Sequence, residues 1–186
     1  MKILVTGCSG FIGFHLCLKL LENYKYKIFG IDNLNDYYEL QLKKSRLKIL
    51  KKNKKFFKFF KLDIKNKKKI ENNFKINHYN YVVHLAAQAG VRYSLLNPKS
   101  YLDNNIIGFF NILDASKKFK IKHLLYASTS SVYGNSKFYP LKENHTTDSP
   151  LSFYAASKKC NEIMAYSYSN LYKLKTTGLR FFTVYG

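Results

Sequence analysis

The sequence predicts an α/β fold in which a doubly wound parallel sheet carries helices on both of its faces. Short apolar runs alternate with longer segments of helical pattern along the 186 residues, as in repeated βαβ units. A glycine-rich turn, Gly7 to Gly13, follows the first apolar run and opens the first helical segment. A chain of this length, 46% hydrophobic, suits one domain with a sizeable core.

The expected strands are the short apolar runs, and the expected helices are the longer segments between them. The strands are expected at Lys2–Thr6, Lys27–Ile31, Phe56–Leu62, Tyr81–Leu85, His123–Ser128 and Thr176–Phe181. The helices are expected at Ile12–Glu22, Asp36–Lys51, Lys65–Phe74, Pro98–Lys118 and Phe153–Tyr172. The residues that lead into the third expected strand are rich in lysine, but the four phenylalanines between residues 56 and 60 favour a strand there.

The formal net charge of +21 suggests nucleic-acid binding, because a basic surface attracts phosphate backbones. However, only Arg46, Arg92 and Arg180 among the 32 basic residues are arginines, whereas base-reading surfaces depend on the planar arginine fork. The lysines cluster at 43–69 and 117–122 among abundant Asn, Ile, Phe and Tyr, which indicates a codon bias expressed on a solvated surface. We expect no specific nucleic-acid partner, and weak binding of polyanions is the alternative.

The sequence carries no obvious targeting signal. The first apolar run, Ile3-Leu4-Val5, is too short for the core of a signal peptide, and no apolar run is long enough to cross a bilayer. The three cysteines, Cys8, Cys17 and Cys160, are odd in number and lack CxxC spacing, which fits free thiols in a reducing compartment. We expect a cytoplasmic protein without a membrane span or a metal site.

The glycine turn has the spacing and the context of a dinucleotide-binding loop. Gly7 permits the tight turn, Gly10 lets a pyrophosphate approach the backbone, and Gly13 lets the helix pack close to the strand. Phe11 and Ile12 lie between them, where the N–H groups of a helix N-terminus face bound phosphates. The turn therefore predicts a cofactor site.

Asp32 ends the second expected strand, 19 residues after Gly13, where a carboxylate accepts hydrogen bonds from an adenosine ribose. A carboxylate there repels a 2′-phosphate, so NAD is favoured over NADP, and Asn33 is placed in the same site. Arg46 and nearby lysines leave NADP open. A turn or a helix cap is the structural alternative for Asp32.

Tyr154 and Lys158 are four residues apart in an expected helix, so their side chains lie on one face. A free phenol has a pKa of about 10 and is a poor base near neutrality unless a neighbouring cation favours the phenolate. Lys158 supplies such a charge. The alternative is an amphipathic helix with a buried ring and a solvated amine.

These features resemble the extended short-chain dehydrogenase/reductase family, whose members have a Rossmann-like NAD-binding domain. The resemblance runs along the whole chain and is closest to the UDP-glucuronate 4-epimerases within the family. Besides the glycine turn, Asp32, Tyr154 and Lys158, the matching motifs are Asp63-Ile64, His84-Leu85-Ala86-Ala87, Asp103-Asn104-Asn105, Ser128-Thr129-Ser130-Ser131-Val132-Tyr133-Gly134 and Arg180-Phe181-Phe182-Thr183-Val184-Tyr185-Gly186.

The resemblance implies which residues hold NAD. Asp63 would bind the adenine amino group and Ile64 would lie beside the ring, with a helix cap as the alternative for Asp63. The segment Leu85 to Ala87 would form a wall of small residues along the cofactor, although the end of a buried strand also explains it. Asn104 would lie near the nicotinamide half, with a solvated side chain as the alternative.

The resemblance also implies the chemistry. Tyr154, as phenolate, would take the proton of a sugar C4 hydroxyl while hydride leaves C4 for NAD. Lys158 would lower the pKa of Tyr154 and bind the nicotinamide ribose. Thr129 would hold the same hydroxyl, unless it is an ordinary strand-end threonine. The 4-keto sugar would then rotate and be reduced on its other face.

The implied reaction interconverts UDP-glucuronate and UDP-galacturonate. Ser128, Ser130 and Thr183 would offer neutral donors to the sugar carboxylate, and Arg92 is a further anion contact. UDP-galactose 4-epimerases typically carry an asparagine at the position of Thr183, and 4,6-dehydratases carry an Asp-Glu pair where Ser130-Ser131 stand. A UDP-glucuronate decarboxylase is the nearest alternative, because the 4-keto intermediate of a uronic acid readily loses CO2.

The chain stops at Gly186 directly after a strand-like run, so we expect the front part of a longer protein. Residues 1–186 would be the NAD-binding domain, with the smaller C-terminal substrate domain absent. Such a chain would bind NAD and turn over UDP-sugar weakly or not at all; a non-catalytic NAD-binding or assembly module is the alternative. Full-length relatives commonly form homodimers through helices corresponding to Pro98–Lys118 and Phe153–Tyr172.

Overall fold

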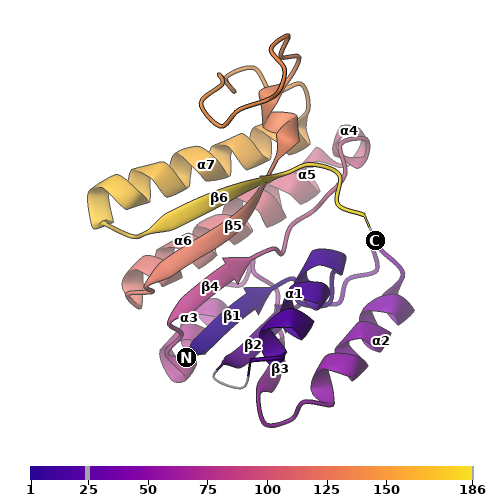
Figure 1. The fold of residues 1–186 in the computed structure, drawn as a ribbon, viewed down its shortest axis with the longest axis vertical. Helices are drawn as coiled ribbons and strands as arrows, with labels where there is room; N and C mark the ends of the chain where they lie inside the picture. Colours follow the sequence, from indigo (N-terminus) through magenta and orange to yellow (C-terminus); the bar gives the residue numbers. More distant parts are fainter. Residues whose placement is uncertain (24–25, 186) are drawn as a thin grey trace.

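In the computed structural model, which describes residues 1–23 and 26–185, helices pack on both faces of one parallel sheet (Figure 1). Its strands are β1 Lys2–Thr6, β2 Lys27–Asp32, β3 Phe57–Lys61, β4 Tyr81–His84, β5 His123–Thr129 and β6 Thr176–Phe181. Their order across the sheet is β3-β2-β1-β4-β5-β6, and every neighbouring pair is parallel. The predicted doubly wound α/β fold is confirmed.

The helices connect these strands in the predicted order, and the bounds predicted for β1, β6 and the last helix are confirmed. In chain order they are α1 Phe11–Leu21, α2 Leu40–Lys51, α3 Lys67–Asn77, α4 Tyr93–Leu96, α5 Pro98–Tyr101, the π-helical η1 Leu102–Gly108, α6 Phe109–Lys118, the 3-10 helix η2 Ser130–Tyr133 and α7 Phe153–Tyr172.

The helix expected from Asp36 was wrong at its start, because α2 begins only at Leu40. The ring of Tyr37 lies 4.9 Å from that of Tyr93, centroid to centroid, and its hydroxyl donates to the Ala89 carbonyl oxygen at 3.0 Å. These contacts with the segment after β4 hold residues 36–39 outside the helix. Tertiary contacts here override the helical pattern of the sequence.

The start of α3 also differs from the prediction. Asn66 caps the helix, and its Oδ1 accepts a hydrogen bond from the Lys69 N–H at 3.0 Å. The helix therefore begins at Lys67, two residues later than expected, and continues to Asn77. Since Asn66 is the cap, Asp63 does not have the capping role that was its structural alternative.

The helix expected at Pro98–Lys118 is interrupted by η1, whose π-helical turns are wider than α-helical ones. Gly108 ends η1 where the chain passes close to Ile64. A Cβ on Gly108 would stand 2.6 Å from Ile64 Cδ1, so a larger residue there would require the Ile64 side chain to move. Within η1, Asn105 hydrogen-bonds to Gln88 in the segment that follows β4.

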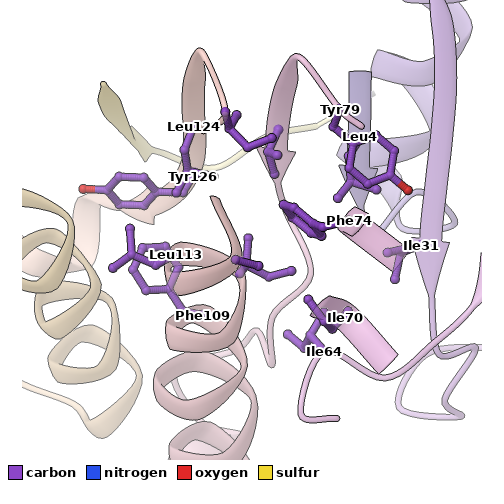
Figure 2. Packing of buried hydrophobic residues seen from close by; sticks show 14 of the residues in the cluster. Leu4, Ile31, Ile64, Ile70, Phe74, Tyr79, Phe109, Leu113, Leu124 and Tyr126 are labelled. Carbon is purple, nitrogen blue, oxygen red and sulfur yellow. The ribbon is translucent and has the colours of Figure 1, made fainter. Parts of the chain in front are cut away.

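Two hydrophobic clusters fill the space between the sheet and its two helical layers. Along β1 the side chains alternate: Leu4 belongs to the cluster under α3 and α6, whereas Ile3 and Val5 belong to the cluster under α1 and α2. Figure 2 shows part of the first cluster, in which Phe74 of α3 and Phe109 of α6 pack against the sheet. Burial on both faces explains why the strands are nearly continuous apolar runs.

The strand order reverses beside β1, which lies between β2 and β4. In open parallel sheets a ligand crevice forms at such a switch point, outside the carboxyl ends of the strands. The glycine turn follows β1 at this edge, and Asp32 ends β2 beside it. The fold therefore brings both predicted cofactor elements to one place.

Candidate cofactor and active site

The glycine turn is packed so closely that side chains would disrupt it. Gly7 has φ of 72°, and a Cβ on it would lie 2.8 Å from the Ala86 backbone nitrogen after β4. A Cβ on Gly13 would overlap the carbonyl oxygen of Gly7. The helix α1 therefore starts directly against the turn, and its N-cap Gly10 carries no side chain to cover the N–H groups of the first turn. This cradle fits a phosphate group.

Asp32 is buried, and its carboxylate organises the turn from the neighbouring strand. Oδ2 accepts a hydrogen bond from the Ser9 N–H at 3.1 Å, and Oδ1 accepts one from the Leu34 N–H at 2.8 Å. Each carboxylate oxygen keeps a lone pair for a ribose hydroxyl. Asp32 thus joins the glycine turn to the loop after β2.

A cavity of about 530 Å³ runs along the carboxyl edge of the sheet from the glycine turn to α7. It brings together most of the predicted site residues. Those that line it are Gly7, Gly10, Phe11, Ile12, Gly13, Asp32, Asn33, Ile64, Leu85, Ala86, Ala87, Asn104, Ser128, Thr129, Tyr154 and Lys158. The sequence did not predict a role there for Tyr38, Leu42 or Lys43, which also line it.

Four predicted site residues are outside the lining of this cavity: Asp63, Arg92, Ser130 and Thr183. Arg92 and Thr183 are exposed, and Ser130 is half-buried in η2. The neighbours of Thr183, Phe182 and Val184, line the cavity instead.

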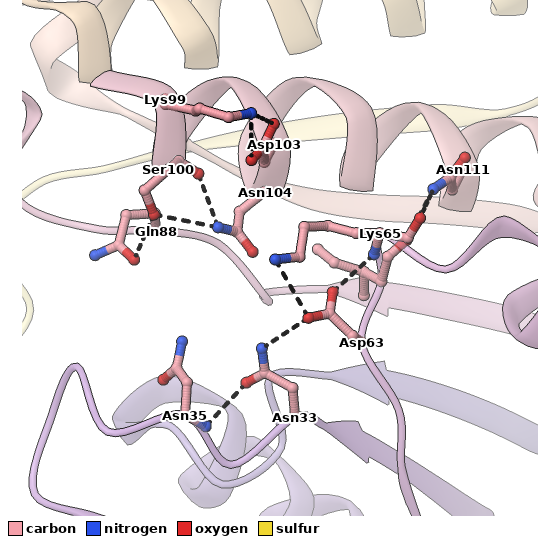
Figure 3. A network of polar contacts seen from close by, with 11 residues as sticks. Asn33, Asn35, Asp63, Lys65, Gln88, Lys99, Ser100, Asp103, Asn104 and Asn111 are labelled. Atoms are coloured by element: carbon pink, nitrogen blue, oxygen red, sulfur yellow. Dashed lines mark hydrogen bonds and ion pairs between the residues drawn. The ribbon is translucent and has the colours of Figure 1, made fainter. Parts of the chain in front are cut away.

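Asp63 connects the loops that follow β2 and β3. Its carboxylate accepts a long hydrogen bond of 3.4 Å from Asn33 Nδ2 and a hydrogen bond of 2.9 Å from the Lys65 N–H. It also forms an ion pair with Lys65 Nζ at 3.5 Å (Figure 3). Asn33 in turn accepts the Asn35 N–H at 3.1 Å. The structure thus gives Asp63 a position next to the cavity residue Asn33.

Two neighbouring asparagines of η1 have different partners, and of the two it is Asn105 that bonds to the segment after β4. Asn104 Nδ2 donates to the Ser100 carbonyl oxygen at 2.7 Å (Figure 3). Asn105 is buried, accepts the Gln88 N–H at 2.7 Å, and donates to the Gln88 carbonyl oxygen and to Ser157 Oγ, each at 3.0 Å. Asn105 therefore links the wall of the cavity to α7. In the sequence, the one sign of a role for Asn105 was its place in the family motif Asp103-Asn104-Asn105.

Thr6 and His84 form a buried pair beneath the wall. Thr6 Oγ1 accepts the N–H groups of Leu85 and Ala86, each at 3.2 Å, and lies 2.8 Å from His84 Nδ1. The threonine proton is therefore donated to Nδ1, and the other ring nitrogen carries the imidazole proton. Burial, and then the charge of Lys158, lowers the pKa of His84 to about 3, so this ring is neutral.

Lys158 is buried and lines the cavity. Its Nζ donates to the Ala127 carbonyl oxygen at 2.9 Å, and burial lowers its pKa to about 8. Burial raises the pKa of Tyr154, and hydrogen bonding with Thr129 offsets part of this rise. Thr129 Oγ1 also accepts the Ser131 N–H at 3.2 Å, which fixes its position at the end of β5.

Ser128 lines the cavity, but its hydroxyl proton is committed elsewhere. Ser128 Oγ donates to Glu162 Oε1 at 2.6 Å, and Glu162 also receives two hydrogen bonds from Arg180. In this arrangement the hydroxyl is not a donor to a ligand. Sequence reasoning missed Glu162, because no short motif marks a carboxylate that pairs across three elements.

Two further findings concern the described residues. Among residues 1–23 and 26–185, no group of three or more His, Cys, Asp and Glu side chains is placed to hold a metal ion. No helix in the same part of the chain is long and apolar enough to cross a membrane.

A glycine cradle at the switch point, together with Tyr154 and Lys158 in the same cavity, defines a dinucleotide-dependent class of α/β protein. The sequence matches the NAD dependent epimerase/dehydratase family over residues 3–186. The chain belongs to this family, as its motifs predicted, and NAD is the family's cofactor.

Individual relatives agree with this assignment. Protein CapI of Staphylococcus aureus is 52% identical over 186 residues, covering 100% of this chain and 55% of that protein. The probable UDP-glucuronate 4-epimerase of Rhizobium meliloti is 43% identical, covering 100% and 54%. The UDP-glucuronic acid 4-epimerase of Bacillus cereus, solved with UDP-glucuronic acid and NAD, superposes with a TM-score of 0.92 at 37% identity, covering 100% of this chain and 58% of that one. The chain spans about half the length of these relatives.

Proposed function

We propose that the chain is the NAD-binding part of a nucleotide-sugar 4-epimerase that interconverts UDP-glucuronate and UDP-galacturonate. One observation carries the proposal: Tyr154, Lys158 and Thr129 line the same cavity as the glycine turn and Asp32. The residues that we propose as proton acceptor and as its cation, Tyr154 and Lys158, thus line the same cavity as the residues that fit a dinucleotide. The names of two relatives support the choice of sugar.

The residues present fit NAD. Gly7, Gly10 and Gly13 would hold the pyrophosphate at the N-terminus of α1, and Asp32 would accept the hydroxyls of the adenosine ribose. The wall at Leu85 to Ala87 would run along the cofactor. When bound, NAD supplies the acceptor and donor of hydride at the sugar C4.

The protein would supply the proton chemistry at the oxygen of C4. Tyr154 Oη would take the C4 hydroxyl proton and later return it, while Thr129 Oγ1 would hold that hydroxyl in place. Tyr154 in its present environment holds its proton tightly, because burial raises its pKa. A charged Lys158 close to the phenol favours the phenolate, and this is the role we propose for it.

Contacts to the sugar carboxylate would come from neutral donors near the end of β5 and after β6. Ser130 and Thr183 would be such donors and Arg92 would be a further anion contact, although none of the three lines the cavity. The proton of Ser128 is held by Glu162, so Ser128 would serve substrate only through its oxygen lone pairs. Product analysis by NMR distinguishes the decarboxylase alternative, which would release CO2 and a UDP-pentose.

The first experiment is a titration with NAD followed by melting temperature. A chain that binds NAD gains stability by mass action, about 2.7 kcal/mol at a cofactor concentration 100 times the Kd. No shift in melting temperature would contradict the proposal and would also exclude a non-catalytic NAD-binding module. Binding of NAD without conversion of UDP-glucuronate by residues 1–186 is the result we expect.

The remaining parts of the proposal concern assembly and location. We propose a homodimer in the full-length protein through the α5–η1–α6 segment and α7, which touch each other and carry exposed apolar residues such as Phe110, Ile163 and Tyr166. Sedimentation measures the state of association. We propose a cytoplasmic location from the three cysteines, Cys8, Cys17 and Cys160, all of which are free.

A further inference from the structure

Glu162 and Arg180 form an ion pair beneath the predicted catalytic residues. The Arg180 fork donates from Nε to Oε1 and from Nη2 to Oε2 of Glu162, each at 2.9 Å. This bidentate geometry is the strong form of a carboxylate–guanidinium contact. The two side chains are only 15% and 19% exposed, so solvent screens the pair weakly.

The pair joins three elements of the site. Glu162 lies on α7 one helical turn beyond Lys158, Arg180 lies on β6, and Ser128 of β5 donates to the same carboxylate at 2.6 Å. Ser128 stands between Ala127, whose carbonyl oxygen accepts Lys158 Nζ, and Thr129. The carboxylate therefore sets the position of α7 against the strand end that carries the other half of the site.

Arg180 extends this contact to the loop that leads into α7. Its Nη1 donates to the Glu143 carbonyl oxygen at 3.1 Å, and its guanidinium carbon lies 4.8 Å from the centroid of the Tyr133 ring. Burial favours the protonated form of Glu162, but hydrogen bonds from Arg180 and Ser128 outweigh burial and lower the pKa of Glu162. Both partners are thus charged at neutral pH.

We propose that Glu162 and Arg180 are positioning residues that hold Tyr154 and Lys158 in register with Thr129, at the nicotinamide half of the cofactor site. The proposal rests on the proposed function, because it assumes that NAD occupies the cavity. The adenosine half lies at the ends of β1 and β2, where the glycine turn and Asp32 are, whereas Arg180 lies on β6 at the opposite edge of the sheet. Loss of the pair should therefore weaken binding of NAD and leave binding of ADP unchanged.

The test compares NAD with ADP, which carries only the adenosine half, by titration calorimetry on the purified chain. Glu162→Gln keeps the shape of the side chain, and Arg180→Lys keeps the charge but lacks the fork. For both variants we expect NAD affinity to fall roughly tenfold at unchanged ADP affinity, as for loss of a charge-assisted hydrogen bond. Bound NADH should also lose fluorescence enhancement, because its nicotinamide ring is held less firmly.

Glu71→Gln is the matched control, since Glu71 pairs with Lys118 between α3 and α6, away from the cavity. It should change neither affinity. Ser128→Ala removes one hydrogen bond of the Glu162 carboxylate and serves as a milder variant if the charge variants do not fold. For this variant we expect a smaller loss of NAD affinity, again at unchanged ADP affinity. Equal loss of NAD and ADP, or wild-type NAD affinity in these variants, would overturn the positioning role. A wild-type chain that binds ADP but not NAD would overturn the proposed function as well.

Discussion

Replacement of Lys158 by methionine should make the protein more stable at neutral pH while removing its proposed catalytic cation. Lys158 is buried, and burial lowers its pKa from an ordinary value of 10.5 to about 8. The unfolded chain therefore binds more protons than the folded chain between these two values. Across that interval the free energy of unfolding of the wild-type protein rises with pH, and below pH 8 the protein carries the full cost of the buried charge.

The size of the effect follows from the two pKa values. Their difference corresponds to about 3 kcal/mol at pH 7, since one pKa unit is worth about 1.4 kcal/mol. Methionine removes this cost but leaves the Ala127 carbonyl oxygen without its donor, which costs about 1 kcal/mol. We expect Lys158→Met to be more stable than the wild-type protein by about 2 kcal/mol at pH 7. Above about pH 10.5 it should be less stable, by about 1 kcal/mol.

Urea denaturation of both proteins at several pH values between 6 and about 10.5 measures this difference. Groups that titrate in this range and lie away from Lys158 contribute equally to both proteins and cancel. Lys75→Met, at an exposed position of α3, is the control, and its difference from the wild-type protein should stay near zero. A Lys158→Met protein that is less stable at pH 7, or whose difference does not change with pH, would refute the account of a buried, destabilising lysine.

Other substitutions test the cradle, the core and the proposed chemistry. Gly13→Ala places a Cβ against the Gly7 carbonyl oxygen, so it should cost roughly 1–3 kcal/mol and abolish the NAD-dependent rise in melting temperature; an unchanged rise would contradict the close packing. Phe74→Ala leaves a cavity at a fully buried site, so it should lower the free energy of unfolding, measured with urea, by about 3–5 kcal/mol. The folded fraction should bind NAD with normal affinity. A loss below about 1 kcal/mol would mean that the core collapses around the cavity. Tyr154→Phe should keep NAD binding but lower any epimerase turnover roughly 10²–10⁴-fold, measured by NMR of the UDP-sugar; wild-type turnover would exclude Tyr154 as the base.

Much of the fold could be predicted because its signals are local. The strand bounds at Lys2–Thr6 and Thr176–Phe181 match the apolar runs, and α7 matches its helical segment from Phe153 to Tyr172. The start of α2 could not be predicted, because Tyr37 is held by Ala89 and Tyr93, far away in the sequence. Long-range contacts of this kind leave no periodic signal in the chain.

In the candidate site too, local features could be predicted from the sequence and long-range contacts could not. The glycine turn and Asp32 could be placed from their spacing, because a strand, a turn and a helix in sequence make one local unit. The contact of Asp32 with Ser9 could not be predicted, since the Ser9 N–H reaches the carboxylate only after β1 and β2 pair, whereas the bond from the Leu34 N–H is a local turn contact. The roles of Tyr154, Lys158 and Thr129 in catalysis stay predictions, although one cavity holds all three residues.

The sequence by itself determined the alternation of strands and helices, the glycine cradle, the acidic residue that ends β2 and the family, because each depends on short motifs of neighbouring residues. Only the tertiary structure decided which charges are buried and with which partners. The pKa of Lys158 is lowered because the folded chain buries its side chain, and Glu162 meets Arg180 and Ser128, which lie 18 and 34 residues away in the chain. Electrostatic energies depend on burial and on distances across the fold, and neither is encoded in local sequence.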